Sequence, residues 1–511
     1  MLSTTSVVAI VAAALFAWLA QRFSARRKFA GLPRVGIEPG FLGLKLPAAK
    51  AEFFEKGQQL MEQGYALVGT PSRQFKWNHK DTPYIIQTVD NERLVVPDKF
   101  IDELKNLPDT QISFKEELLD RFMGKYTKMD AVRGSNIHRE VVTGPLTKSL
   151  GKLLPLMKEE AEVSLSQTLK DVNAKEFTPI KGSGLIFSAI GQITSRILVD
   201  EPFARDPAWL ETIMGYTASV AIFSMTMRTI NPIFRPIAYW TLASGKKLRA
   251  DIKKIENFLV PVIKTRQNRP EEKQAPQDIV QWLIEGVKDK DKQPEQIVLK
   301  ILFLIVAAMH TSAVTAIHVL YDLVAQPEAM EALRAEARAE IAANGWSLTT
   351  LLKLRKMESF LKESGRVNSA GVVSFQRFTL APITLSNGFT IPANTHICAA
   401  SDARSRDSAL YANPTEFEPL RFYEEGTDLD SAKLFSSVVA GDSWFGFGRQ
   451  ACPGRWYASA LIKLILCLLL VEYDLELKYP KGQTGRPKNW VKDEKTGPDM
   501  EQMILIKKRQ A

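Results

Sequence analysis

One cysteine is placed to act as a metal ligand. Cys452 stands in the stretch FGFGRQACPGR at residues 445–455, where three glycines allow tight turns and close approach to a flat ligand. An apolar segment follows and predicts a buried helix over 455–473. Free N–H groups and the helix dipole favour a thiolate just before a helix N-terminus. On iron, such a thiolate donates electron density and favours O–O bond cleavage.

The other two cysteines have a simpler interpretation. Cys398 lies in a strand-like segment and Cys467 in a run of leucines, so both are predicted to be core thiols. Three cysteines in 511 residues indicate no disulfide framework and a reducing compartment.

A second group of polar residues interrupts the most apolar helix of the chain. Pro294 predicts its first turn and Pro327 its end, and residues 301–309 are almost wholly apolar. That apolar run is too short to span a membrane, so a central buried helix is expected. His310, Thr311 and Ser312 follow it, and unpaired polar groups are costly there. A hydroxyl that holds a water beside a proton-relaying histidine would explain them, and a satisfied core histidine is the alternative for His310.

A third group can form buried ion pairs. Glu363 and Arg366 are three residues apart and share one face of a predicted helix. Such a pair alone is weak evidence, because surface bridges with this spacing are common. Another arginine, Arg421, stands further along the chain in FEPLRF at residues 417–422.

These segments together resemble the cytochrome P-450 superfamily of haem-thiolate monooxygenases. The family's cysteine loop is Phe-x-x-Gly-x-(Arg/His)-x-Cys-x-Gly, and Phe445, Gly448, Cys452 and Gly454 match it. Gln450 stands where the family has a cation that pairs with a haem propionate. The resemblance implies haem b with Cys452 as the axial iron ligand.

The resemblance also implies roles for the other groups. Glu363, Arg366 and Arg421 match a structural triad that locks the haem-side core. Arg377 and His138 occupy positions similar to those of propionate-binding residues, and ordinary surface or core residues are the alternative for each. The family's oxygen-activating helix has (Ala/Gly)-Gly-x-(Asp/Glu)-Thr-(Thr/Ser), so here His310 replaces the acid before Thr311.

The first residues are typical of a membrane anchor. Residues 1–20 carry no charge, and Arg22 and residues 26–28 are basic. The basic residues follow the apolar stretch, whereas in a cleavable signal peptide they would precede it. The same charge asymmetry places the basic side in the cytoplasm. We expect a transmembrane anchor at 1–21, a basic and Pro/Gly hinge at 22–40, and one catalytic domain at 41–511. The alternative is a segment that only lies in the membrane interface.

The net charge of +10 favours acidic partners. No Lys/Arg tract is interleaved with aromatic residues, so nucleic acid is not expected. The resemblance implies an NADPH-dependent flavoprotein reductase as partner and a monomer on the endoplasmic reticulum membrane, with its catalytic domain in the cytoplasm. The apolar, proline-interrupted stretch 221–240 would line a substrate entrance or dip into lipid, or form a core helix pair.

The predicted fold is mainly α with a minor β-sheet, as in the cytochrome P-450 fold. Residues 278–288 predict a helix; residues 375–380 and 389–392 predict strands, with Asn387-Gly388 as the turn between them.

The resemblance implies insertion of one atom of O₂ into a hydrophobic small molecule, in fungal secondary metabolism of terpenoids, polyketides or alkaloids. The motifs are closest to ent-kaurene-oxidase-like members. A reductase-independent peroxygenase or isomerase is one alternative, motivated by the missing acid before Thr311. A non-catalytic haem- or lipid-binding membrane protein is the other.

Overall fold

The computed structural model describes residues 29, 31–40, 43–67, 82–269, 276–288, 291–369, 371–426, 434–439, 444–479 and 485–510. The predicted anchor at 1–21 and the basic part of the hinge lie outside the described residues. Within them, helices Gly182–Val199 and Pro294–Val324 are long and apolar enough to cross a membrane, but 78% and 61% of their most apolar windows are buried inside the protein. Both are therefore core helices.

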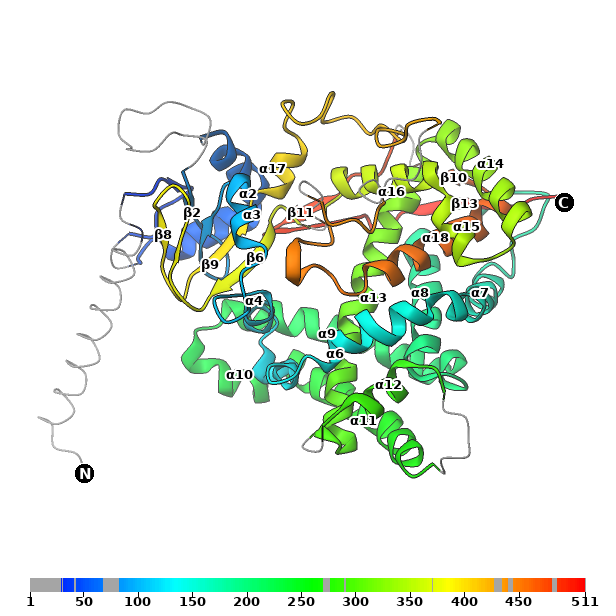
Figure 1. The fold of residues 1–511 in the computed structure, drawn as a ribbon, viewed down its shortest axis with the longest axis horizontal. Helices are drawn as coiled ribbons and strands as arrows, with labels where there is room; N and C mark the ends of the chain where they lie inside the picture. The colour runs from blue at the N-terminus through cyan, green and yellow to red at the C-terminus, as the bar shows by residue number, and fades with distance from the viewer. Residues whose placement is uncertain are drawn as a thin grey trace, which may run out of the picture. The chain divides into compact units, whose positions relative to one another are not determined.

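The chain divides into two compact units, and the first consists of residues 1–117, 371–410 and 491–495. Its described strands form a mixed sheet in the order β1-β2-β3-β9-β6-β4 (Figure 1). Its elements are β1 (Arg34–Val35), α2 (Leu46–Leu67), β2 (Tyr84–Gln87), β3 (Glu92–Val95), η2 (Asp98–Phe100), α3 (Ile101–Leu104), β4 (Ile112–Ser113), β6 (Ser374–Thr379), β7 (Ile383–Thr384), β8 (Thr390–Ile391), β9 (His396–Ala399) and α17 (Ser401–Ser405). Three elements contain points where the chain passes between the units: α4 (Phe114–Arg121), β11 (Trp490–Lys492) and β12 (Lys495–Gly497).

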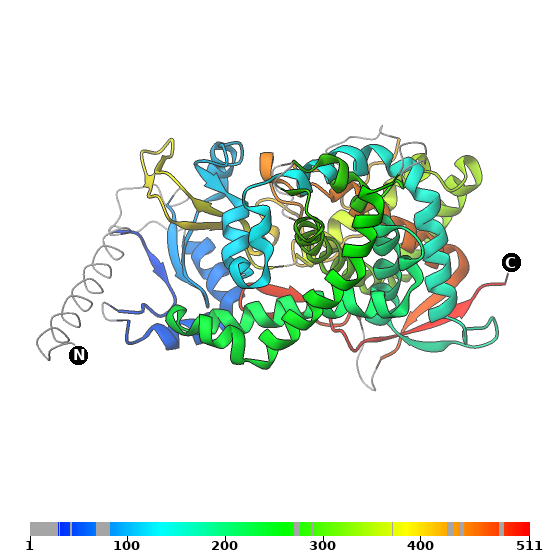
Figure 2. The ribbon, with the colours of Figure 1, turned by 90° about the horizontal axis from the view of Figure 1, so that it is seen from below.

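The second unit, residues 118–370, 411–490 and 496–511, is mainly helical. Its helices and helical turns are α5 (Gly124–Thr127), η3 (Met129–Val132), α6 (Ile137–Val141), η4 (Val142–Leu146), α7 (Thr147–Thr168), α8 (Gly182–Val199), η5 (Phe203–Arg205), α9 (Pro207–Thr229), η6 (Pro232–Phe234), α10 (Arg235–Thr241), α11 (Ala243–Gln267), α12 (Ile279–Gly286), α13 (Pro294–Val324), α14 (Pro327–Asn344), α15 (Leu348–Lys353), α16 (Arg355–Val367), η9 (Gly448–Gln450) and α18 (Arg455–Glu472). A small sheet has the order β10 (Tyr473–Leu477), β13 (Met503–Lys508), β5 (Thr178–Lys181), and β13 is the red strand beside the C-terminus in Figure 2.

The predicted long helices agree with the structure because prolines and apolar runs mark them. α13 begins at Pro294, where the missing N–H removes no helical bond, and ends at Val324, before Pro327. α18 has an almost continuously buried run from Ser459 to Leu470. Cys467 and Cys398 are both fully buried, as predicted. The described chain is thus mainly helical with small sheets, as the sequence predicted.

The predicted pairing of two strands was wrong. β6 and β8 both exist, and Asn387-Gly388 turns the chain, but the turn does not join these two strands. β8 pairs with the short strand β7, whereas β6 pairs with β9 and β4. Pro382 lies between β6 and β7 and lacks the N–H that a continuous ladder needs, so β7 forms a separate hairpin with β8.

Candidate active site

The cysteine loop turns sharply at its glycines and closes on itself through the cysteine backbone. Gly446 and Gly448 have φ values of 72° and 60°, in the left-handed region that favours glycine. The Cys452 N–H donates to the Phe445 carbonyl over 2.7 Å. α18 begins at Arg455, three residues beyond the cysteine. The predicted loop and the following helix are therefore both present, and Cys452 is a free thiol at their junction.

The electrostatic environment of Cys452 differs from the expectation in one respect. A backbone hydrogen bond from Gly454 and the positive charge of Arg455 both lower the pKa of the thiol, as the position before a helix predicted. Burial raises it more, and the pKa lies above its ordinary value. The helix terminus alone therefore does not make a thiolate here. A bound metal cation deprotonates a coordinating thiol outright, and would supply the remaining stabilisation.

Aromatic rings pack beside the loop. The Phe435 ring stacks on Trp444 at 6.1 Å and meets Phe445 edge-on at 5.0 Å. Trp444 in turn lies against α16, where a Cβ on Gly365 would come within 3.0 Å of the indole. A glycine at this helix position lets the indole pack closely against α16 without displacing it.

The centre of α13 is exposed along one stripe. Ala307, His310 and Thr311, spaced as neighbours on one helix face, are exposed, while Met309 and Ser312 are buried. The expectation of a helix buried all round is therefore wrong at this stripe, and His310 is not a core histidine. The Thr311 hydroxyl donates to the Ala307 carbonyl over 2.7 Å, and the His310 ring lies 6.0 Å from that of Phe187 on α8.

Helix α6 connects α13 with the cysteine loop. The His138 ring is buried and meets Phe303 of α13 edge-on, with centroids 4.9 Å apart. The next residue, Arg139, donates through Nη2 to the carbonyl of Arg449 in the loop. Gln450 ends the short helical turn of this loop and is partly buried. The structure therefore brings His138 beside the central helix. Arg139 was not singled out from the sequence, because its contact lies 310 residues away.

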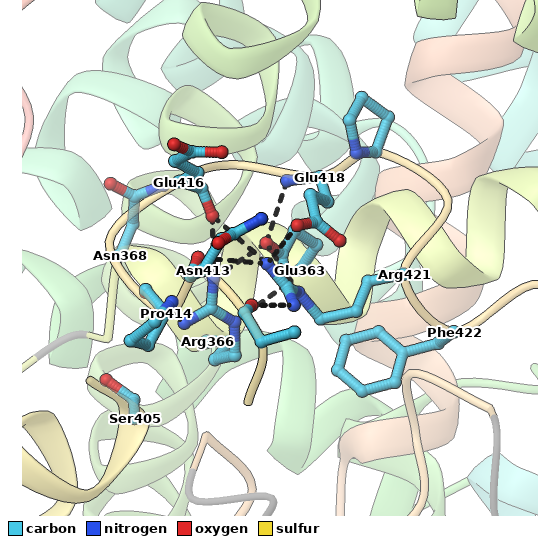
Figure 3. Close-up of polar contacts among 12 residues, drawn as sticks. Glu363, Arg366, Asn368, Ser405, Asn413, Pro414, Glu416, Glu418, Arg421 and Phe422 are labelled. Atoms are coloured by element: carbon cyan, nitrogen blue, oxygen red, sulfur yellow. Dashed lines mark hydrogen bonds and ion pairs between the residues drawn. The ribbon is translucent and has the colours of Figure 1, made fainter. Parts of the chain in front are cut away.

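Glu363, Arg366 and Arg421 form one buried network (Figure 3). Arg366 donates to both carboxylate oxygens of Glu363 at 2.7 and 2.8 Å, and Arg421 reaches them at 3.1 Å. The Glu418 N–H donates to the same carboxylate over 2.9 Å. The free ends of the two guanidinium groups donate to main-chain carbonyls of residues 412–416. The network thus ties the 412–421 segment to α16.

Removing one partner of this network should prevent haem loading. Glu363→Ala leaves the buried Arg366 without its carboxylate and Arg421 with only the Glu418 ion pair, and Arg366→Ala leaves a buried carboxylate short of its bidentate partner. Breaking such a pair costs about 3–5 kcal/mol, a large part of the roughly 5–15 kcal/mol that stabilises a domain. Haem-to-protein ratios and circular dichroism should reveal haem-free or unfolded protein. Glu416→Ala, which removes an exposed side chain and keeps its carbonyl, is the control. A fully haem-loaded Glu363→Ala protein would show that the pair is dispensable.

Arg377 lies on β6, in the first of the two units. Its side chain is buried, and burial lowers the pKa of the guanidinium to about 10. Phe375 and Phe114 stack on it at 4.5 and 5.3 Å. Nη1 donates to the Gln376 carbonyl, whereas Nη2 has no hydrogen-bond partner among the described residues. A buried donor of this kind calls for an anionic acceptor.

These residues fit a haem group. The second unit offers a free thiol in a glycine loop and an exposed stripe across an otherwise apolar helix, and the first unit, taken by itself, offers a buried arginine with an unused donor. Iron accepts the thiolate, the flat ring is largely apolar, and the propionates are anionic, so each feature has a chemical counterpart in haem.

Comparisons with known proteins identify the family of this chain. Residues 107–494 match the family model "Cytochrome P450". Cytochrome P450 monooxygenase AN1598 of Emericella nidulans is 31% identical over 440 residues, covering 84% of this chain and 81% of that protein. Ent-kaurene oxidase P450-4 of Gibberella fujikuroi is 31% identical over 452 residues, covering 88% of each. The crystal structure of the cytochrome P450DA haem domain superposes with a TM-score of 0.67 at 16% identity, covering 94% of this chain and 98% of that one.

The fold and the site thus define a haem-thiolate enzyme. The chain belongs to the cytochrome P450 family. The predicted function is confirmed at this level: the chain is a monooxygenase that inserts one oxygen atom of O₂ into a hydrophobic small molecule, and its relatives are fungal enzymes of secondary metabolism.

Proposed function

We propose that Cys452 is the axial ligand of haem b and that NADPH supplies electrons through a separate membrane-bound flavoprotein reductase. The observation that carries the ligand assignment is the cysteine loop. It combines left-handed glycines, a closing bond from the Cys452 N–H to Phe445, and a free thiol before α18. The net charge of +10 supports an acidic docking partner such as the reductase.

The neighbouring side chains have distinct tasks in this proposal. Arg377 and His138 bind the propionates, and Gln450 contributes an amide hydrogen bond in place of the usual cation. When bound, haem supplies the activation of O₂. The exposed Thr311 hydroxyl already donates to Ala307, so its free lone pairs accept a hydrogen bond from water. His310, exposed one residue earlier, exchanges a proton with that water at near-neutral pH.

The substrate is proposed to be an apolar terpenoid. The support is the similarity over most of the chain to an ent-kaurene oxidase, together with the surroundings of the exposed stripe on α13. Phe187 lies next to His310, and Ala307 offers only a methyl group. Such a surface favours a hydrocarbon skeleton over a charged ligand.

The direct test uses the full chain in microsomes that contain a reductase. With terpene hydrocarbons as candidate substrates, NADPH consumption and incorporation of one ¹⁸O atom from ¹⁸O₂ are measured. Product that requires both NADPH and O₂ supports the monooxygenase with a reductase partner. Product formed from hydrogen peroxide at an equal rate, without NADPH, would favour the peroxygenase alternative instead.

We further propose that the enzyme is anchored in the endoplasmic reticulum membrane by residues 1–21 and touches lipid through a second surface. We name this surface the α9–α10 patch; it consists of Ile222, Met225, Ile233, Phe234, Ile237 and Trp240, which are 45–78% exposed. Large apolar side chains gathered in this way mark an interaction surface. Other side chains of α9, such as Phe223 and Met227, are fully buried and pack in the core, as the alternative of a core helix predicts for them.

Deleting residues 1–28 should move more than half of the protein from the membrane pellet to the supernatant. A transmembrane helix holds a protein to the membrane far more strongly than an apolar surface patch, and the deletion removes the helix. Ile233→Ser/Phe234→Ser/Ile237→Ser in the truncated chain should release the remainder. The matched control is Leu352→Ser/Leu410→Ser, two exposed leucines outside the patch. Full membrane retention of the truncated triple variant would show that neither segment is the main anchor.

A further inference from the structure

A single charged residue interrupts the apolar run of α18, although it is itself buried. Lys463 lies between Ile462 and Leu464, and only 2% of its side chain is exposed. A buried ammonium group is costly unless it is paired and hydrogen-bonded. Lys463 was not predicted to have a role, although a lysine within an otherwise apolar helix indicates a buried partner.

The partner of Lys463 is Glu358, near the start of α16. Lys463 Nζ donates to one carboxylate oxygen of Glu358 and, over 2.9 Å, to the Leu351 carbonyl. Glu358 is almost as buried as the lysine, with 4% of its side chain exposed. Its second carboxylate oxygen accepts the backbone N–H of Phe435 over 2.6 Å. The ion pair therefore holds a third segment, the chain just upstream of the cysteine loop.

Phe435 carries this contact into the loop. Its carbonyl accepts the Trp444 indole N–H over 2.9 Å, and its ring packs on both Trp444 and Phe445. The Phe445 carbonyl accepts the Cys452 N–H. A continuous series of contacts thus runs from Lys463 through Glu358, Phe435 and Phe445 to the cysteine.

We infer that Glu358 is a positioning residue for the cysteine ligand: its carboxylate, paired with the buried Lys463, accepts the Phe435 N–H and holds that segment in place. This inference rests on the proposed role of Cys452. The pair is separate from the Glu363 network, which holds residues 412–421 instead of the segment at Phe435. Loss of the hydrogen-bond acceptor at residue 358 is expected to let the loop relax, so that a fraction of the haem is no longer bound by a thiolate.

Two double variants isolate the contact to Phe435. Glu358→Gln/Lys463→Met and Glu358→Met/Lys463→Met both remove the buried charges, so neither strands a lone ion in the core. Glutamine and methionine have similar size, but only glutamine has an amide group at residue 358, whose oxygen can accept the Phe435 N–H. The measurement is the fraction of total haem whose reduced carbon monoxide complex has the red-shifted Soret band of thiolate ligation.

The glutamine variant is expected to keep the wild-type fraction. The methionine variant should shift the ratio of the two spectral forms by about fivefold or more toward the unshifted form, since it leaves a buried N–H without an acceptor. Arg266→Met is the control for general destabilisation. Arg266 is also a buried cation that donates to a carboxylate, Asp278, and to a carbonyl, that of Val199, and both partners lie outside the cysteine loop. It should lower thermal stability without changing the spectral ratio.

Equal spectral ratios in the two double variants would overturn the inference, as would an equal loss in Arg266→Met. Cys452→Ala, measured in parallel, separates this failure from a failure of the ligand assignment. If Cys452→Ala keeps the red-shifted band, the assignment is wrong. If it loses the band while the double variants agree with each other, only the positioning role of Glu358 is wrong.

Discussion

Cys452→Ala should abolish the red-shifted Soret band of the reduced carbon monoxide complex and reduce product to background. The band reports a thiolate on the iron, and alanine has no donor atom. The change is small in volume and lies in a loop whose shape is set by glycines and by the Cys452 backbone N–H, which alanine retains. The Cys452→Ala substitution is therefore expected to change the iron ligand much more than the folding of the loop.

The chain contains a matched control for this variant. Cys467→Ala removes the same atom from the middle of α18, where the thiol is fully buried and its pKa is raised to about 12 by burial. It should cost stability through a small cavity and keep the band. A Cys452→Ala protein with an unchanged spectrum would contradict the central assignment.

Thr311→Ala should bind substrate and consume NADPH nearly normally, while product falls and hydrogen peroxide rises. General acid–base assistance is typically worth roughly 10²- to 10⁴-fold, so the loss of product per NADPH is expected to be large. Thr311→Ser restores a hydroxyl and should recover much of the coupling. Thr315→Val tests the next turn, because the Thr315 hydroxyl donates to the Thr311 carbonyl and holds only the helix. The Thr315→Val variant should still convert NADPH consumption into product as wild type does.

The adjacent histidine tests whether protons pass through a side chain as well as through water. His310→Asp restores the acid usual in the family and should keep substantial activity. His310→Phe preserves a ring against Phe187 and removes the proton carrier, so it should release peroxide as Thr311→Ala does. Unchanged coupling in His310→Phe would reduce His310 to a packing residue and leave Thr311, Ser312 and water as the proton route.

Sequence reasoning succeeded where a local signal was strong. Prolines predicted the limits of α13, and the glycine pattern predicted a tight loop before α18. The spacing of Glu363 and Arg366 indicated a shared helix face, and the structure adds the distance to Arg421. In each case neighbouring residues carried the information, through backbone freedom, a missing N–H or helical periodicity.

The features that the sequence did not predict depend on contacts between segments far apart in the chain. Lys463 and Glu358 are 105 residues apart, so no local pattern predicts their pairing. The exposed stripe on α13 was missed because an apolar helix has the same composition whether it packs against protein or faces an apolar ligand. The hairpin of β7 and β8 was missed because β7 contains only two residues.

The position of β13 has a consequence for the order of events during synthesis. This strand, at the very end of the described chain, lies between β10 and β5 and is the middle strand of its sheet. A ribosome adds roughly 5–20 residues per second, so the cysteine loop emerges several seconds before the strand that completes the unit. During that interval β5 and β10 have no partner between them, and the helical unit is open at one edge. Synthesis of the cysteine loop and closure of the sheet are therefore separate steps in time, and a message that ends before Met503 yields the loop in a unit whose sheet lacks its middle strand.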